Sequence, residues 1–213
     1  MDDAALTERG FDAAAGASPG RTLLIACGAL AREVLALKEA NGWGHLDLVC
    51  LPAKLHLHPE RIPEAVRAAV RKGRAAGYDD VFVLYADCGT GGLLDKVCEE
   101  EGVERIPGPH CYSFFDGNEA FAARGDEEMR AFYLTDFLVR QFDAFVWRPM
   151  GLDRHPDLRD MLFGNYERLI YLAQTEDQAL DEAARDAASR LGLAYERRFT
   201  GYGDLAAALR GAA

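Results

Sequence analysis

Several features are missing from the sequence, and each absence excludes a class of protein. No apolar stretch reaches the roughly 18 to 20 residues of a membrane-spanning helix, so we expect no membrane association. The opening segment has neither a basic stretch nor an apolar core, which predicts no secretory signal and a cytoplasmic location. Positive charge is scarce: 24 Lys and Arg against 35 Asp and Glu give a net charge of −11, which disfavours nucleic-acid binding.

Common cofactor and metal motifs are also absent. The chain has no G-x-G-x-x-G dinucleotide fingerprint, no P-loop, and no cysteine pair two residues apart as in a compact zinc ribbon. Its five cysteines are an odd number in a chain too large to depend on disulfides, so we expect thiols or metal ligands. Hydrophobic residues make up 49%, enough for a substantial core.

Apolar runs alternate with helical patterns, which predicts an α/β fold with a mostly parallel sheet and flanking helices. The expected strands are 22–28, 46–56, 79–92 (running into a glycine-rich turn), 103–108, 165–175 and 193–201. The expected helices are 29–41, 58–77, 91–102, 177–192 and 202–211.

The domain organisation follows from this pattern. We expect residues 1–21 to be a flexible lead-in and 22–213 to form a single α/β domain. Within it, 22–110 and 164–213 form either two lobes or one sheet, and the aromatic-rich segment 111–163 is a helical insertion.

Three of the five cysteines follow different predicted strands. Cys27 ends the first strand, Cys88 follows the third and Cys111 follows the fourth. Ligands of parallel sheets bind beyond the carboxyl ends of the strands, so these thiols are expected to converge there. Three thiolates with one open position are typical of a catalytic metal site. Either Zn²⁺ or a [4Fe–4S] cluster suits them, and we favour zinc slightly because it better fits a cytoplasm with thiol substrates.

The histidines add candidates near this edge. His56 and His58 point to opposite faces if their strand continues, and we prefer His58 as the further ligand. His110 is a ligand, a base or a helix cap, and either it or Asp87 is expected to handle protons. Buried free cysteines often only fill space, which is our interpretation of Cys50 and Cys98.

The turn around Cys88 has a second possible use. A glycine-rich turn between a strand and a helix offers backbone N–H groups to an anion, and the helix start favours a reactive Cys88 thiolate without metal. The residues expected to contact a cofactor in this way, here and after the first strand, are Gly28, Gly89, Thr90 and Gly91.

Six short segments, in order along the chain, resemble the bacterial and archaeal family called domain of unknown function 1638. They are IACGALAREV, LPAKLHLHPERI, VLYADCGTGGL, IPGPHCYSFFDG, FYLTDF and GNYERLIYL. This chain departs from the family pattern at Ala86, where Gly is usual, at His110, where an acidic residue is frequent, and at Asp136-Phe137, where Gly-Trp is usual.

The resemblance implies a soluble protein whose activity the family name does not establish. Family members are considered alongside corrinoid and methyltransferase systems, which implies one-carbon or thiol chemistry and a corrinoid or methyltransferase protein as partner. The three-cysteine plan is also similar to quinolinate synthase and diphthamide-synthesis enzymes, where three α/β units hold an iron–sulfur cluster.

We therefore predict a metal-dependent enzyme, a transferase or lyase, in which Cys27, Cys88 and Cys111 hold the metal and a small-molecule substrate takes the open position. One alternative is a metal- or corrinoid-handling carrier without turnover. Another is a small-molecule-binding domain whose cysteines are structural.

Overall fold

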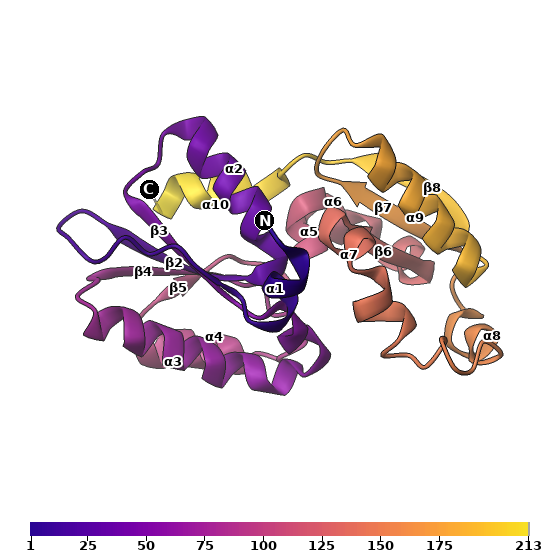
Figure 1. The fold of residues 1–213 in the computed structure, drawn as a ribbon, viewed down its shortest axis with the longest axis horizontal. Helices are drawn as coiled ribbons and strands as arrows, with labels where there is room; N and C mark the ends of the chain where they lie inside the picture. The colour runs from indigo at the N-terminus through magenta and orange to yellow at the C-terminus, as the bar shows by residue number, and fades with distance from the viewer. Residues whose placement is uncertain (213) are drawn as a thin grey trace. The chain divides into compact units, whose positions relative to one another are not determined.

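A computed structural model describes residues 1–212, without the side chains of residues 126–128, and it confirms the α/β prediction (Figure 1). The chain divides into two compact units. The first combines Met1–Phe114 with the C-terminal segment from Asp204, and the second is Phe115–Gly203. These bounds differ from the expected lobes because the last helix buries Leu205 and Leu209 in the first unit.

The first unit is built on a five-stranded mixed sheet in the order β1-β3-β2-β4-β5. Its strands are β1 (Phe11–Asp12), β2 (Thr22–Cys27), β3 (Leu46–Leu51), β4 (Asp80–Leu84) and β5 (Glu104–Arg105). β1 pairs antiparallel with β3, and all the other pairs are parallel. In the centre, Ala26 of β2 lies opposite Cys50 of β3 and Leu84 of β4.

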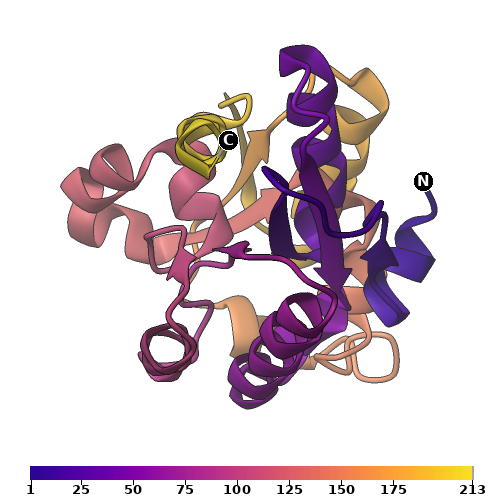
Figure 2. The same cartoon turned by 90° about the vertical axis from the view of Figure 1, so that its left-hand side faces the viewer.

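Helices cover both faces of this sheet, which explains why β2 is apolar along almost its whole length. α3 and α4 lie on one face, and α2 and α10 lie on the other (Figures 1 and 2). The α-helices are α1 (Asp3–Glu8), α2 (Ala31–Asn41), α3 (Ile62–Ala75), α4 (Leu93–Glu101), α5 (Cys111–Asp116) and α10 (Gly203–Ala212). The 3₁₀ helices are η1 (Gly28–Leu30), η2 (Ala53–Leu57) and η3 (Pro59–Arg61).

The second unit has a parallel sheet in the order β6-β7-β8, made by β6 (Ala131–Thr135), β7 (Arg168–Ala173) and β8 (Ala194–Phe199). Its helical elements are α6 (Asn118–Arg124), η4 (Gly125–Arg130), α7 (Asp136–Arg140), η5 (Asp143–Trp147), α8 (Leu158–Phe163) and α9 (Gln178–Leu191). At the carboxyl edge, buried Asp136 accepts hydrogen bonds from the Tyr171 hydroxyl at 2.7 Å and from the Gln174 N–H at 3.0 Å.

Three local predictions differ from the structure. Residues 131–135, expected to be helical, form β6, because this short run is buried on both faces of the strand and pairs with β7. The second strand ends at Leu51, since Pro52 cannot donate to the ladder, and η2 follows. The first 21 residues, expected to be a flexible lead-in, contain α1, whose Leu6 is buried, and β1.

Within the described residues, no helix is both long enough and apolar enough to cross a bilayer.

A buried carboxylate ties the N-terminal segment to the sheet. Asp47 of β3 accepts hydrogen bonds from Arg21 Nε at 2.8 Å, from the Tyr78 hydroxyl at 2.6 Å and from the Ala15 N–H at 3.2 Å. Burial by itself raises the pKa of Asp47, but these donors outweigh it and lower the pKa to about 2. The charged form of Asp47 is therefore favoured by folding.

We predict that Asp47→Asn lowers the free energy of unfolding by about 2 kcal/mol at neutral pH, because the shift of nearly two pKa units is lost. A depressed pKa stabilises the fold above the unfolded-state value, and this stabilisation fades as the pH falls toward 2. Urea unfolding at several pH values between 7 and 3 measures the difference in free energy of unfolding between the variant and the unchanged protein. This difference should become smaller as the pH falls. The exposed Asp79→Asn variant is the control; a gap independent of pH would contradict this assignment.

Candidate functional site

The first sheet changes direction between β2 and β4, since the chain goes from β2 outward to β3 and then returns to β4 on the other side. In open α/β sheets such a switch point forms a crevice at the carboxyl ends, where ligands bind. Cys27 is the last residue of β2, and Cys88 lies in the loop after β4. Cys111, the first residue of α5, follows β5. All three cysteines therefore come from the carboxyl edge of one sheet.

A small cavity brings these cysteines together. Its volume is about 10 Å³, close to the minimum that holds one water molecule. It is lined by Cys27, Ala29, Leu30, His56, Leu84, Tyr85, Ala86, Cys88 and Cys111. The lining thus joins three sulfurs, one imidazole and one phenol with apolar walls, and it leaves room for a single atom or ion.

Cys27 is the most deeply buried of the three sulfurs, with 3% of the residue exposed. Its Sγ lies 3.5 Å from His56 Nδ1 and accepts the Ala29 N–H at 3.4 Å. Burial raises the pKa of the Cys27 thiol to about 12, although the Ala29 N–H and the Tyr85 hydroxyl act in the opposite direction. Cys27 on its own is therefore a neutral thiol at neutral pH.

The Cys88 loop is shaped by the carboxylate of Asp87. This carboxylate accepts hydrogen bonds from the Thr90 hydroxyl at 2.7 Å and from the N–H groups of Gly91 at 3.1 Å and Gly92 at 2.8 Å. Among the described residues, Cys88 is the only non-glycine with positive φ, at 52°. This left-handed conformation is costly for a residue with a Cβ, so the surrounding hydrogen bonds must hold it.

A second set of backbone contacts places Cys111 beside this loop. The N–H groups of Asp87 and Cys88 donate to the carbonyl oxygens of Gly108 and Pro109, both at 2.9 Å. Two residues later α5 begins at Cys111. Burial raises the pKa of Cys111 well above its ordinary value, and negative charge on Cys88 and Cys27 raises it further. The three sulfurs are thus electrostatic neighbours.

The structure places His56 at the cavity and His58 outside it. The alternation between these residues assumed a continuing strand, whereas η2 turns the His56 ring toward Cys27. The side chain of His58 is 59% exposed and lies 3.6 Å from the Glu60 carboxylate. Burial lowers the pKa of His56, but its interaction with Cys88 outweighs burial and leaves the pKa raised.

His110 directly precedes Cys111 and is half-buried. Its ring stacks on Tyr112 with centroids 4.8 Å apart, and it is absent from the cavity lining. Burial lowers the pKa of His110, against the opposing charge of Asp87, so its imidazole is neutral at neutral pH. A neutral, half-buried imidazole is able to accept a proton.

The glycine-rich turn is already filled by a group of the chain itself. The Asp87 carboxylate takes the N–H group of Gly91, which was expected to contact an anion, and also that of Gly92. Burial opposes its ionisation, but the Thr90 hydroxyl and the glycine N–H groups outweigh burial and lower the Asp87 pKa. Asp87 is consequently a poor proton acceptor and acts as the anion that organises the turn.

Gly28 was expected to contact a cofactor, but close packing of the chain is enough to explain a glycine at this position. A Cβ at this position would lie 2.5 Å from the Leu6 carbonyl oxygen and 3.1 Å from the Leu51 carbonyl oxygen. Only glycine permits such a close approach between η1 and helix α1.

The spacing of one donor pair matches that of two zinc ligands. Two ligands of tetrahedral zinc, a sulfur at ~2.3 Å and a nitrogen at ~2.0 Å, lie about 3.5 Å apart. The Cys27 Sγ to His56 Nδ1 distance has this value. In the part of the chain that the structure describes, no group of three Cys, His, Asp or Glu side chains is arranged to hold an ion. The donor types and one pair distance fit zinc, and the Cys88 and Cys111 residues line the same cavity.

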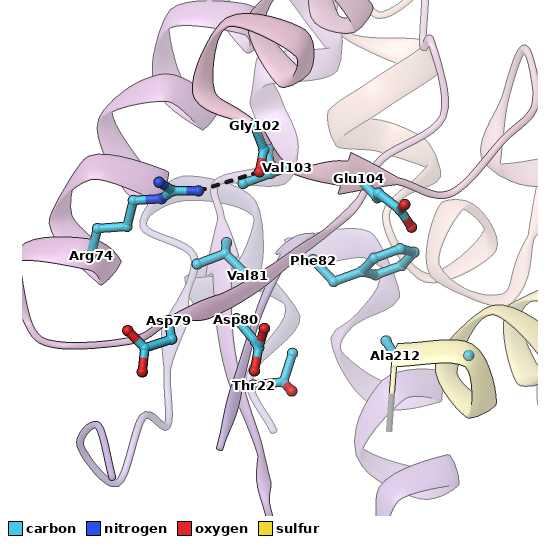
Figure 3. Close-up of a pocket in the computed structure, with 11 residues that line it drawn as sticks. Thr22, Arg74, Asp79, Asp80, Val81, Phe82, Gly102, Val103, Glu104 and Ala212 are labelled. Carbon is cyan, nitrogen blue, oxygen red and sulfur yellow. Dashed lines mark hydrogen bonds between the residues drawn. The ribbon is translucent and has the colours of Figure 1, made fainter. Parts of the chain in front are cut away.

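A larger cavity of about 400 Å³ lies at the opposite edge of the same sheet (Figure 3). Its lining includes Thr22 and Asp80, where β2 and β4 begin, and Glu104 of β5. Arg74 also lines it, but the guanidinium donates to the Gly102 carbonyl oxygen at 3.3 Å. No cysteine or histidine lines this cavity, so its chemistry differs from that of the small one.

Sequence reasoning missed Tyr85 and did not prefer His56. Tyr85 follows a buried strand and therefore reads as another core aromatic. The signal that identifies it is structural, because its hydroxyl is buried at the cavity without a regular hydrogen-bond partner. For His56, the sequence contains one indication, Pro52. A proline ends the strand here, so His56 and His58 do not alternate between the two faces of a sheet.

Comparison with known proteins gives one match. The model of the family described as "Protein of unknown function (DUF1638)" matches residues 50–209, a range that contains His56, Cys88 and Cys111. No curated protein and no solved structure matches the chain. Since the match covers most of the sequence, the chain belongs to the DUF1638 family.

Proposed function

We propose that the first unit binds a zinc ion through Cys27, His56, Cys88 and Cys111, and that the protein is a zinc-dependent enzyme acting on a small molecule. The observation that carries this proposal is the convergence of three thiols and one imidazole on one cavity at the switch point of the sheet. These donor types are the ones that zinc prefers. In this proposal His56 replaces His58, the ligand preferred from the sequence, because His56 lines the cavity.

The size of the cavity favours zinc over an iron–sulfur cluster. A volume of about 10 Å³ accommodates one atom, whereas a [4Fe–4S] cluster brings four irons and four sulfides. The imidazole of His56 is also a frequent zinc ligand. Zinc supplies a Lewis acid and keeps a bound thiol deprotonated at neutral pH.

The chain's own residues divide the remaining tasks. Asp87 holds the loop that presents Cys88. Cys88 and Cys111 are less buried than Cys27. Four protein ligands leave tetrahedral zinc no open position, so a substrate thiol is expected to approach from this more open side and to displace Cys88. His110, neutral and next to Cys111 in the chain, is the proposed proton acceptor. Thiol or one-carbon chemistry, with a corrinoid or methyltransferase protein as partner, remains the proposal that the family resemblance supports.

A carrier that binds and delivers metal without turnover is the second candidate. The observation in its favour is that four donors surround a space for one atom, with no room for an organic substrate inside. The two candidates share the metal and differ in turnover.

We predict about one zinc ion per chain in protein purified anaerobically under reducing conditions. Serine at Cys27, Cys88 or Cys111 should lower zinc occupancy at least ~10-fold, because each substitution removes a thiolate ligand. Elemental analysis measures this. Cys98→Ser, in helix α4 away from the cavity, should retain the metal. Folded wild-type protein without zinc affinity would leave the cysteines as structural residues.

The two histidines provide a matched pair. His56→Ala should weaken zinc binding at least ~10-fold, because the imidazole faces Cys27. His58→Ala should leave zinc binding unchanged, since this side chain is exposed. Competition with a chromophoric chelator measures both affinities. Equal losses in the two variants would remove His56 from the proposed ligand set.

Turnover separates the enzyme from the carrier. Zinc-loaded protein, mixed with a small thiol and a methyl donor, should form several product molecules per chain, and Cys88→Ser should form fewer. Product that never exceeds one equivalent per chain, at any donor concentration, is the result expected of a carrier. Mass spectrometry of the small thiol provides the count.

A further inference from the structure

Tyr85 carries a buried polar group that the fold itself does not satisfy. The residue is 1% exposed, and its hydroxyl has no hydrogen-bond partner of regular geometry among the described residues. His56 Nε2, in the same cavity wall, is also buried without such a partner. A buried hydroxyl that loses its bonds to water without gaining another costs free energy, so its retention requires an explanation.

The position of Tyr85 restricts what its hydroxyl can reach. The ring stacks on His56 with a centroid separation of 6.3 Å and an interplanar angle of 16°, and it lines the cavity with the three cysteines. Ala26 lies opposite Leu84 at the end of the β2–β4 ladder, and the residues that follow them, Cys27 and Tyr85, interact through their side chains. The hydroxyl is therefore confined to the sulfur end of the cavity.

The chemistry of the two groups changes when a metal binds. A tyrosine hydroxyl is protonated at neutral pH and donates one hydrogen bond. A neutral thiol is a weak acceptor, whereas a thiolate forms a charge-assisted bond about twice as strong as a neutral one. Metal binding replaces the proton on Cys27, so the weak acceptor beside the Tyr85 hydroxyl in the metal-free protein becomes a strong one on loading.

We propose that the Tyr85 hydroxyl donates a hydrogen bond to the Cys27 thiolate of the zinc-loaded site, and that Tyr85 is a positioning residue for this sulfur. The proposal rests on the zinc site proposed above. It gives Cys27 two donors, the Ala29 N–H and the Tyr85 hydroxyl, and makes it the fixed sulfur of the set. Cys88, on the more open side, is then the sulfur that exchanges with an incoming ligand.

The test compares Tyr85→Phe with the unchanged full-length chain, both metal-free and loaded with zinc. In the metal-free state the variant should be as stable as the unchanged protein or more stable, because it removes an unsatisfied hydroxyl. Its zinc affinity should be about tenfold lower, the loss expected for one charge-assisted hydrogen bond. In the cobalt-substituted protein the thiolate-to-metal absorption bands should also shift.

Tyr166→Phe is the control, because this ring packs against Phe132 and Phe163 in the second unit and contacts nothing in the cavity. It should change neither zinc affinity nor the cobalt spectrum. Equal zinc affinities and spectra for Tyr85→Phe and the unchanged protein would overturn the assignment of Tyr85 alone. A similar loss of stability with and without metal would mean a purely structural role. An unchanged protein that binds no zinc would overturn both proposals.

Discussion

The carboxylate of Asp87 is the constraint on which the geometry of the site depends. By accepting the N–H groups of Gly91 and Gly92 and the Thr90 hydroxyl, it closes the turn between β4 and α4. That turn forces Cys88 into a left-handed backbone, which an isolated cysteine would avoid. An internal anion thus does the work that a bound phosphate does in other glycine-rich turns, and the turn is used to present a sulfur.

Around this turn the fold assembles donors that are far apart in the sequence. Parallel strands bring Cys27 and Cys88 to one edge, and the backbone pairing of Cys88 with Pro109 brings Cys111 alongside. The resulting cavity is apolar apart from the sulfurs, His56 and Tyr85. Neutral thiols are stable in an apolar cavity, whereas the buried Tyr85 hydroxyl costs free energy unless it finds a good hydrogen-bond acceptor. The buried Tyr85 hydroxyl among these sulfurs is the feature that favours the zinc site we propose over a set of packing cysteines.

The sequence was sufficient for the α/β class and for the alternation of strands and helices, because those depend on local hydrophobic periodicity. It also led to the three cysteines, since parallel topology alone implies that strand ends meet. It could not give the course of the chain after Pro52, where a 3₁₀ helix replaces a strand and selects His56 over His58. Nor could it identify β6, because an aromatic-rich run is compatible with both a helix and a strand until its neighbour β7 is known. The state of the Tyr85 hydroxyl, on which we base its proposed role, is visible only in the structure.

Gly28 links the site to a helix that carries none of its chemistry. Because the backbone after Cys27 touches the Leu6 carbonyl, and because α1 also contacts η2, this one short helix braces the two segments that bear Cys27 and His56. The packing of α1 against both segments therefore helps to set the 3.5 Å distance between Cys27 Sγ and His56 Nδ1. A bulkier residue at position 28 would push α1 away from η1. The distance between Cys27 and His56 would then change, although both residues would still be present.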